Sequence, residues 1–117
     1  MRPARVSVLA RLRQVIAQVP RGRVITYGEV AAAGGVPNAA RLAVRALQGA
    51  ANLPWHRVVG AGGRIRLPGE AGREQRLRLR IEGVTFRGGR VDMGRHGWVP
   101  RPRAYRSGSP SRSGRRP

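Results

Sequence analysis

Residues 26–48 read TYGEVAAAGGVPNAARLAVRALQ, which is two short helical patterns separated by a pair of glycines. The first pattern begins with a capping box, because the Thr26 hydroxyl can accept from the Glu29 amide while the Glu29 carboxylate reaches back to the Thr26 amide. We expect this helix to run through residues 30–33, and a second helix to cover residues 38–48. A short helix, a glycine turn and another helix are typical of a helix-turn-helix.

The second of these helices carries small side chains and two arginines on its surface. Ala39, Ala40 and Ala43 are small, and Arg41 and Arg45 lie four residues apart, on one side of the helix. Small side chains let a helix approach another surface closely, and arginine can contact phosphates or bases. The alternative is that the alanines pack against the first helix, and we expect some of them to do so. The main core positions we expect are Leu42, Ala46 and Leu47.

Other elements flank this helix pair. Apolar residues at three- and four-residue spacings predict an amphipathic helix over residues 5–18, which Pro20 stops. A β-hairpin is expected at residues 57–67, because two apolar segments flank a glycine-rich turn there. The fold class predicted is a single, mainly α domain with a small β-hairpin, a helix-turn-helix domain of winged-helix-like form.

The C-terminal part of this domain is expected to hold a last helix over residues 70–82, in which Leu77 and Ile81 lie four apart. A second small hairpin is expected around Gly88-Gly89. Its strands are placed at residues 84–86 and 91–93. We expect Trp98 to dock back on the body of the domain.

The charge of the chain is strongly unbalanced. Its 117 residues contain 24 arginines, no lysine and five acidic residues, so the formal net charge is +19. Such a surplus favours a polyanionic partner, and nucleic acid is the most abundant one. A ribosome-associated or anionic-lipid-binding protein would share the surplus. A G+C-rich genome would explain the choice of arginine over lysine, but not the shortage of acids.

The arginines are also unevenly placed along the chain. Residues 101–117 hold six arginines and no acid, and we expect this Arg-rich segment to be a disordered tail behind a domain at residues 1–100. The tail either adds non-specific attraction to phosphates or has no role.

The composition excludes several classes of protein. The chain has no cysteine, which excludes disulfides, thiolate zinc sites and a cysteine nucleophile. Two histidines and five acids argue against a metal site, and no cofactor is expected. No run of 18 apolar residues exists and the N-terminus is a poor signal peptide, so we expect no membrane partner and a cytoplasmic, nucleoid-associated protein.

The string Pro54-Trp-His-Arg-Val-Val59 is distinctive. It resembles the active-site motif Pro-Cys-His-Arg-Val of the O6-alkylguanine-DNA alkyltransferases, with tryptophan in place of the cysteine. That replacement is the hallmark of the alkyltransferase-like proteins, their non-transferring relatives. The resemblance spans roughly residues 6–98. Three further segments carry it: residues 20–31, residues 38–41 and residues 82–84.

The resemblance implies a mainly helical DNA-binding domain and assigns roles at the DNA. Arg41 matches the arginine finger that enters the base stack, and Tyr27 matches the tyrosine that helps to rotate a nucleotide outward. Ala39 and Ala40, beside Arg41, would let the helix approach the groove closely, and Arg45 would add a contact to phosphate or base. In such proteins the helix-turn-helix lies in the minor groove.

The resemblance also implies a pocket for the flipped base. Trp55 stands at the position of the alkyl-accepting cysteine, near Tyr27, and Val58 matches a pocket-lining position whose backbone contacts the flipped guanine. His56 and Glu82 match the pair that activates the cysteine in the transferases, and we expect them to persist here as a hydrogen-bonded structural relic.

The chain departs from the family pattern at two places. Some relatives use a loop arginine to sense the electrostatics of the modified base, and that position falls at Pro68 here; Arg66 is a candidate substitute. The recognition helix of the family usually reads Ala-Arg-x-Val-Gly-x-Ala-Leu, whereas Ala43 and Val44 exchange the small and the large residue in this chain.

These observations predict a non-enzymatic sensor of DNA damage. It would act as a monomer, bind O6-alkylguanine in duplex DNA through the minor groove, and flip the nucleotide into a pocket walled by Trp55. The family role implies transfer of the bent DNA to nucleotide excision repair proteins. The alternatives are a general basic helix-turn-helix regulator or nucleoid factor without lesion preference, and a protein that binds structured RNA or the ribosome. An active alkyltransferase is the enzymatic alternative, which the missing cysteine argues against.

Overall fold

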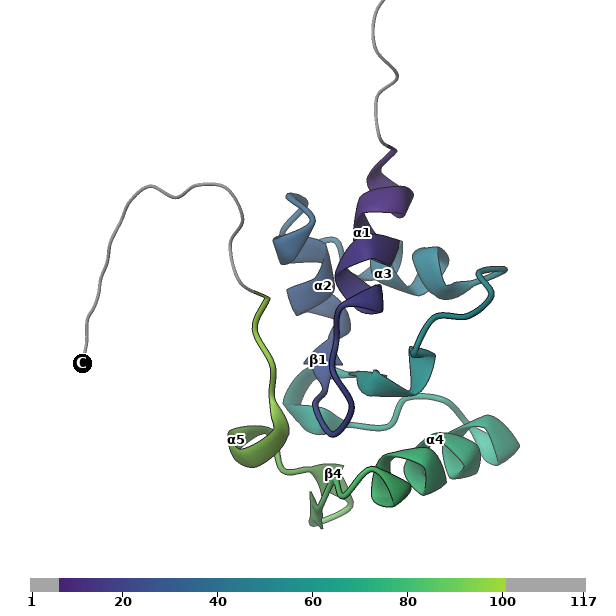
Figure 1. The fold of residues 1–117 in the computed structure, drawn as a ribbon, viewed down its shortest axis with the longest axis vertical. Coiled ribbons are helices and arrows are strands. Elements are labelled where there is room, and N and C mark those ends of the chain that lie inside the picture. Colours follow the sequence, from purple (N-terminus) through teal and green to yellow (C-terminus); the bar gives the residue numbers. More distant parts are fainter. Residues whose placement is uncertain (1–6, 101–117) are drawn as a thin grey trace, which may run out of the picture.

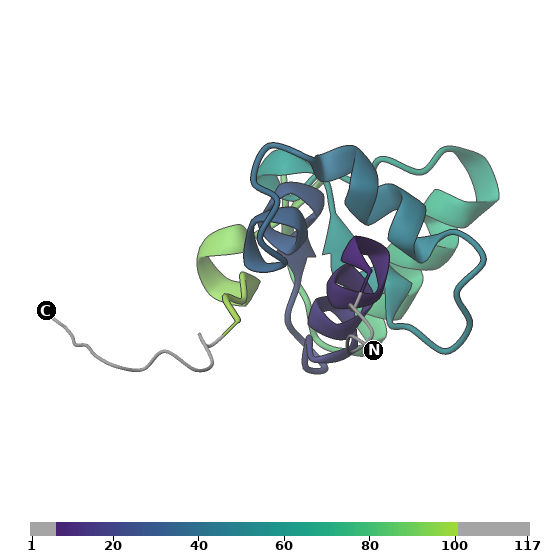
Figure 2. The same ribbon diagram turned by 90° about the horizontal axis from the view of Figure 1, so that it is seen from above.

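The computed structural model describes residues 7–100, and its elements are stacked in three layers (Figure 1). Three helices form the first layer: α1 (Val8–Ala17), α2 (Tyr27–Ala33) and α3 (Ala40–Leu47). Figure 2 shows α3 alongside α1. The predicted helix pair is therefore confirmed, with α3 beginning two residues later than expected.

Local signals set the start of α1. The Ser7 hydroxyl accepts a hydrogen bond from the Ala10 amide at 3.0 Å, which caps the helix. Leu12 and Ile16 lie four residues apart and are fully buried, so one face of α1 covers the core. Residues 5 and 6 of the predicted helix lie outside the described part of the chain.

Two short strands form the middle layer. β1 (Ile25–Thr26) pairs in parallel with β2 (Val58–Val59), with Ile25 opposite Val58. Successive residues of a strand point to opposite faces. Ile25 and Val58 accordingly pack with the three helices, whereas Val59 packs in a second cluster on the other side of the sheet. This small sheet therefore separates two apolar cores.

The third layer holds the C-terminal elements. It contains α4 (Gly69–Ile81), the hairpin of β3 (Phe86–Arg87) with β4 (Arg90–Val91), and the short helix α5 (Met93–His96). The second predicted hairpin is thus confirmed, with shorter strands. Trp98 packs against the first core, and its amide donates to the Val24 carbonyl at 2.8 Å, so its docking on the body is confirmed.

The hairpin predicted at residues 57–67 is wrong. Val58 and Val59 form β2, but β2 pairs with β1, while residues 64–67 form no strand. Two 3-10 turns lie on either side of β2: η1 (Trp55–Arg57) and η2 (Ala61–Gly63). Both valines of β2 are fully buried, and a strand buried on both faces fits a covered parallel pair better than a half-exposed hairpin.

The face of α4 also differs from the expected one. Leu77 and Ile81 are 57% and 64% exposed, whereas Gln75 and Leu79 are buried. Buried hydrogen bonds of Gln75, described below, hold this face of the helix inward. The apolar spacing of Leu77 and Ile81 therefore indicated the wrong side of α4.

Two expectations about the chain as a whole remain. The Arg-rich segment 101–117 lies outside the described residues, so the predicted domain boundary stays a prediction. Within residues 7–100, no helix combines the length and apolar character required to cross a bilayer.

Candidate nucleic-acid interface

Tyr27 is the first residue of α2 and lies directly after its cap. The Thr26 hydroxyl accepts from the Glu29 amide at 3.1 Å, and the Glu29 carboxylate accepts from the Thr26 amide at 2.9 Å. The predicted capping box is therefore confirmed. Tyr27 is half-buried against the first core, and this burial raises the pKa of its phenol, although the nearby positive charge of Arg66 acts to lower it. The cap thus fixes the position of a neutral phenol.

The second helix of the pair presents its arginines outward. Arg41 and Arg45 are exposed on α3, together with Ala40, while Ala39 at the N-cap position is half-buried. Ala39 has no side-chain oxygen to cap the helix, and the Leu42 amide donates to the Ala39 carbonyl at 2.9 Å instead. Two exposed arginines on one short helix suit contacts to phosphates.

The opposite face of α3 is packed closely against the other helices. Ala43 and Ala46 are fully buried, whereas Leu42 and Leu47 are partly buried at the edge of the first core. Small residues therefore make the main contacts of α3. Val44 is 39% exposed, so the exchange of small and large residues at 43 and 44 leaves the small one inside.

Arginines from α1 anchor both helices of the pair. Arg13 donates from Nε to the Ala46 carbonyl at 2.8 Å, and Arg11 donates from Nε to the Gly34 carbonyl at 3.0 Å. These bonds satisfy carbonyls near the ends of α3 and α2 that have no partner within their helices. Sequence reasoning had treated the arginines of α1 as charge alone; their positions facing the neighbouring helices were not visible from spacing.

Trp55 lies at the start of η1 and is half-buried. The guanidinium carbon of Arg78 lies 5.4 Å from the centroid of the indole, a cation–π distance. Glu74, one turn earlier on α4, accepts from Arg78 Nε at 2.7 Å and orients it. The His56 ring meets the indole edge-on, with centroids 6.1 Å apart. The indole is therefore held by two neighbours and is not sealed in the core.

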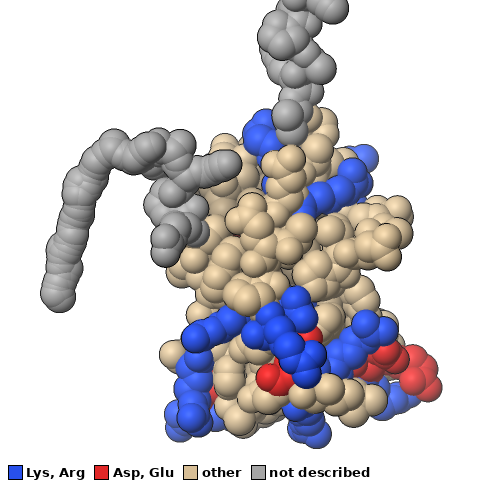
Figure 3. Space-filling model, viewed as in Figure 1, with Lys and Arg blue, Asp and Glu red and all other residues tan. Residues whose placement is uncertain are grey.

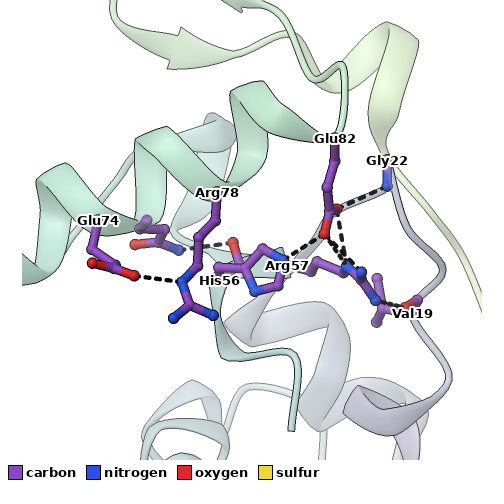
Figure 4. Close-up of polar contacts among 8 residues, drawn as sticks. Val19, Gly22, His56, Arg57, Glu74, Arg78 and Glu82 are labelled. Carbon is purple, nitrogen blue, oxygen red and sulfur yellow. Dashed lines mark hydrogen bonds and ion pairs between the residues drawn. The ribbon is translucent and has the colours of Figure 1, made fainter.

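Glu82 is the centre of a buried polar network that includes His56, the residue after Trp55 (Figure 4). Its carboxylate lies 2.7 Å from His56 Nε2, and it accepts from Arg57 Nη2 at 2.7 Å and from the Gly22 amide at 2.9 Å. Arg57 also donates to the Val19 carbonyl at 3.0 Å. One carboxylate thus joins the end of α4, η1 and the turn after α1.

The surroundings of Glu82 stabilise its charged form. Its side chain is only 5% exposed, and this burial acts to raise the pKa of the carboxyl. The hydrogen bonds from Arg57, the Gly22 amide and His56 outweigh burial and lower the pKa to about 2. The carboxylate is therefore a structural anion at neutral pH.

Arg57 is the member of this network that sequence reasoning missed. The expected pair of His56 and Glu82 is present at hydrogen-bonding distance. A buried acid needs a cation beside it, but with 24 arginines in the chain only the structure shows that Arg57 is that cation.

Gln75 was missed as well. It is 1% exposed on α4, and its Nε2 donates to the carbonyls of His56 and Val58 at 3.2 and 2.8 Å. A buried polar residue needs such partners. These two bonds fix η1 and the start of β2 against α4.

Val58 lies inside the domain, at the start of β2. Its side chain is fully buried in the first core, and its carbonyl accepts from Gln75. The expected pocket contact through the backbone of Val58 stays a prediction.

Arg66 is exposed, and its charge acts on the Tyr27 phenol. The aliphatic part of the Arg66 side chain lies against Gly60. A Cβ atom added at Gly60 would lie 2.6 Å from Arg66 Cγ, which is too close for a side chain at that position. The lack of a side chain at Gly60 thus leaves room for the stem of Arg66. Pro68 is the exposed N-cap residue of α4.

The predicted site residues therefore fall into three groups. Trp55, His56 and Glu82 are joined, and Tyr27 and Arg66 interact through charge. In residues 7–100 no hydrogen bond, ion pair or ring contact links either of these groups to the third group, Arg41 and Arg45 on α3. Three or more possible metal ligands do not gather anywhere in that part of the chain.

Comparison with known proteins relates this arrangement to a family. The model of the 6-O-methylguanine DNA methyltransferase DNA-binding domain matches residues 8–84. The chain is 42% identical over 92 residues to the "DNA base-flipping protein" of Escherichia coli, covering 75% of this chain and 71% of that protein. The chain belongs to the alkyltransferase-like family.

A further sequence match and a solved structure relate this alkyltransferase-like protein to the same family. It is 35% identical over 75 residues to "Alkyltransferase-like protein 1" of Schizosaccharomyces pombe, which covers 62% of this chain and 69% of that one. A crystal structure of S. pombe Atl1 with damaged DNA containing O6-carboxymethylguanine superimposes with a TM-score of 0.69 and 29% identity, covering 80% and 95% of the two chains. The family expected from the motif at residues 54–59 and the predicted fold class are thereby confirmed. The alkyltransferase-like protein described here has no cysteine that could accept an alkyl group, and it is not an enzyme of that kind.

Proposed function

We propose that this protein is a non-enzymatic sensor that binds O6-alkylguanine in duplex DNA and holds the nucleotide outside the helix. The observation that carries the proposal is Trp55, a half-buried indole at the acceptor position of a cysteine-free chain. Indole has no group that can take up an alkyl substituent, but its face can stack on a base. The site would therefore read the lesion and leave it unrepaired.

Helices α2 and α3 would act as a helix-turn-helix, with α3 in the minor groove. The exposed Ala40 lets the helix approach the groove closely, with Ala39 at the cap, while Arg45 is free for phosphate. Arg41, at the second position of α3, would enter the gap left by the flipped base, since a flat guanidinium can stack on the neighbouring bases. Tyr27 would meet the phosphate of the rotated nucleotide. The name of one relative, the "DNA base-flipping protein" of Escherichia coli, supports base flipping as the activity of this site.

Arg66 would supply the charge that senses the modified base, in place of the family's loop arginine. Its support is the electrostatic coupling to Tyr27, which brings a cation to the side of the site where Pro68 offers none. The backbone of Val58 would line the pocket. We further propose that the protein acts as a monomer in the cytoplasm, associated with the nucleoid, and that it passes lesions to nucleotide excision repair.

A competition titration tests this function. A labelled duplex with one O6-methylguanine is displaced by the same duplex with or without the lesion, at about 0.15 M salt. The proposal predicts that the lesion duplex competes at least tenfold better. Equal competition would instead support the alternative of a general basic DNA-binding protein, and stronger competition by structured RNA would point to an RNA-binding protein.

A further inference from the structure

The β3–β4 hairpin brings two arginines face to face. Its strands are joined by Gly88-Gly89, whose φ angles of +57° and +80° suit the tight turns that glycine makes without strain. The register places Arg87 opposite Arg90 and Phe86 opposite Val91. Val91 is 3% exposed and faces the core, so Arg87 and Arg90 project together from the outer side of the hairpin.

Helix α4 adds two arginines to this hairpin. The guanidinium carbons of Arg76 and Arg80 lie 5.4 and 5.3 Å from the centroid of Phe86. Arg76 also donates to the Gly89 carbonyl at 3.1 Å. A stacked guanidinium keeps donors at its rim for another acceptor. The hairpin arginine patch is defined as Arg87 and Arg90 on the outer side of the hairpin, together with Arg76 and Arg80, which contact Phe86 from α4.

No acid is paired with the hairpin arginine patch in the described part of the chain, although Asp92 follows Arg90 by two residues. Residues 76–90 contain five arginines and one acid, Glu82, which the buried network of His56 and Arg57 already uses. The fifth arginine, Arg78, pairs with Glu74. In the described part of the chain, no salt bridge includes an arginine of the patch. Like charges directly opposite in a hairpin are destabilising, so an anion bound at Arg87 and Arg90 would offset this cost.

The patch lies in a different layer from α3. Figure 1 places α4 and the hairpin at the opposite end of the body from the three-helix layer, and Figure 3 shows arginine atoms gathered over this lower part of the visible face. The Arg90 side chain nevertheless lies close to Gly62, because a Cβ atom added at Gly62 would be 3.5 Å from Arg90 Nη1. Gly62 belongs to η2, the turn that precedes Arg66 in the chain. The patch therefore adjoins the loop beside the base-reading residues.

We propose that the hairpin arginine patch binds the phosphate backbone of duplex DNA outside the contact made by α3. Four arginines on the hairpin and the adjoining helix, none of them in a salt bridge within residues 7–100, suit phosphates, which bind arginine in a bidentate manner. The phosphates belong either to the flank of the duplex that carries the lesion or to a second duplex. The inference rests on the proposed function only in taking DNA as the ligand.

The salt dependence of binding tests the patch. Affinity for an unmodified duplex of about three helical turns is measured over a range of salt for the wild type, Arg87→Ala, Arg90→Ala and the double variant. Each lost phosphate contact is expected to reduce the slope of log affinity against log salt by about 0.9. Arg73→Ala is the matched control, because Arg73 lies on α4, is 69% exposed, and also removes one charge.

Two additional arms identify the source of the phosphates. If they come from the flank of the same duplex, shortening the DNA to about one turn removes the difference between Arg87→Ala and the wild type. If they come from a second duplex, the wild type brings donor- and acceptor-labelled duplexes together in an energy-transfer assay and the double variant does not. Either result supports the patch.

The inference is overturned if Arg87→Ala, Arg90→Ala and the double variant show the same slope as Arg73→Ala on long DNA. Thermal unfolding checks that the variants fold, and removing one of two opposed arginines is expected to leave stability equal or higher. The ratio of affinities for lesion and unmodified DNA stays unchanged in these variants. A protein without lesion preference but with the expected slopes would contradict the proposed function and leave the patch supported.

Discussion

Arg78 covers one face of Trp55, with its guanidinium carbon 5.4 Å from the centroid of the indole. The two residues come from different elements, α4 and η1, and Glu74 fixes the arginine by a hydrogen bond of 2.7 Å. A cation over one face fixes the orientation of the ring, and we propose that the other face stacks on the base. The relationship makes Arg78 a positioning residue for the proposed site.

Replacing Arg78 by alanine is expected to lower the preference for lesion DNA. A cation–π contact at a partly exposed site contributes about 0.5–1 kcal/mol, so the ratio of affinities for O6-methylguanine and unmodified duplex should fall about two- to fivefold. Arg73→Ala removes an equal charge from the same helix and should leave the ratio unchanged. The two variants are compared by competition titration. If Arg78→Ala and the wild type have the same ratio of affinities for lesion and unmodified duplex, Arg78 does not position Trp55 for lesion binding.

Arg41→Ala and Arg45→Ala should separate flipping from phosphate contact. Both arginines are exposed on α3, so neither substitution disturbs the core. Arg41→Ala should weaken lesion binding more than it weakens binding to unmodified duplex, because the gap in the base stack is then left unfilled. Arg45→Ala should weaken both equally and reduce the salt slope. Affinities over a range of salt for both duplexes measure the two effects, and equal behaviour of the variants would contradict the assignment.

The low pKa of Glu82 predicts how stability changes in acid. The folded pKa of about 2 lies below the ordinary value of 4.5, so the carboxylate stabilises the fold fully above pH 4.5 and loses its contribution as the pH falls toward 2. The difference corresponds to on the order of 3 kcal/mol. Urea unfolding between pH 7 and pH 2 should show this loss.

Two variants make the acid test specific. Glu82→Gln should be destabilised at pH 7 by about 3–5 kcal/mol, since Arg57 and the Gly22 amide lose a charged acceptor, and its stability should depend less on pH. Glu74→Gln is the control, because this carboxylate is 50% exposed. If Glu82→Gln loses stability in acid to the same extent as the wild type, the loss is caused by other titrating groups.

Much of the first layer, which contains α1, α2 and α3, could be predicted from local sequence signals. The capping box at Thr26 and Glu29 specifies the start of α2, and the apolar spacing of Leu12 and Ile16 specifies the buried face of α1. The Gly88-Gly89 turn likewise marks the hairpin at β3 and β4. These features depend on residues close together in sequence, where propensity and periodicity are informative.

The features that were missed depend on distant pairing. Val58 and Val59 look like half of a local hairpin, but they pair with Ile25 and Thr26 across more than thirty residues. The buried side of α4 is set by Gln75, whose partners are carbonyls of η1 and β2. Sequence spacing alone carries no information about such partners.

The sequence motif identified the candidate site, but it did not identify the residues that hold the site in place. Trp55, His56 and Glu82 follow from the string at residues 54–59 and the end of α4, whereas Arg57 and Arg78 appear only in three dimensions. In a chain with 24 arginines, sequence offers no way to tell which ones are paired and which are free for DNA.

The central claim is that the indole of Trp55 stacks on the flipped lesion, and its fluorescence tests this directly. The chain has two tryptophans, so the Trp98→Phe variant leaves Trp55 as the sole reporter while an aromatic ring still fills the docked position. The variant is saturated with O6-methylguanine duplex or with the unmodified duplex. The account predicts strong quenching of Trp55 by the lesion duplex and little by the unmodified one; equal quenching by both at saturation would contradict it.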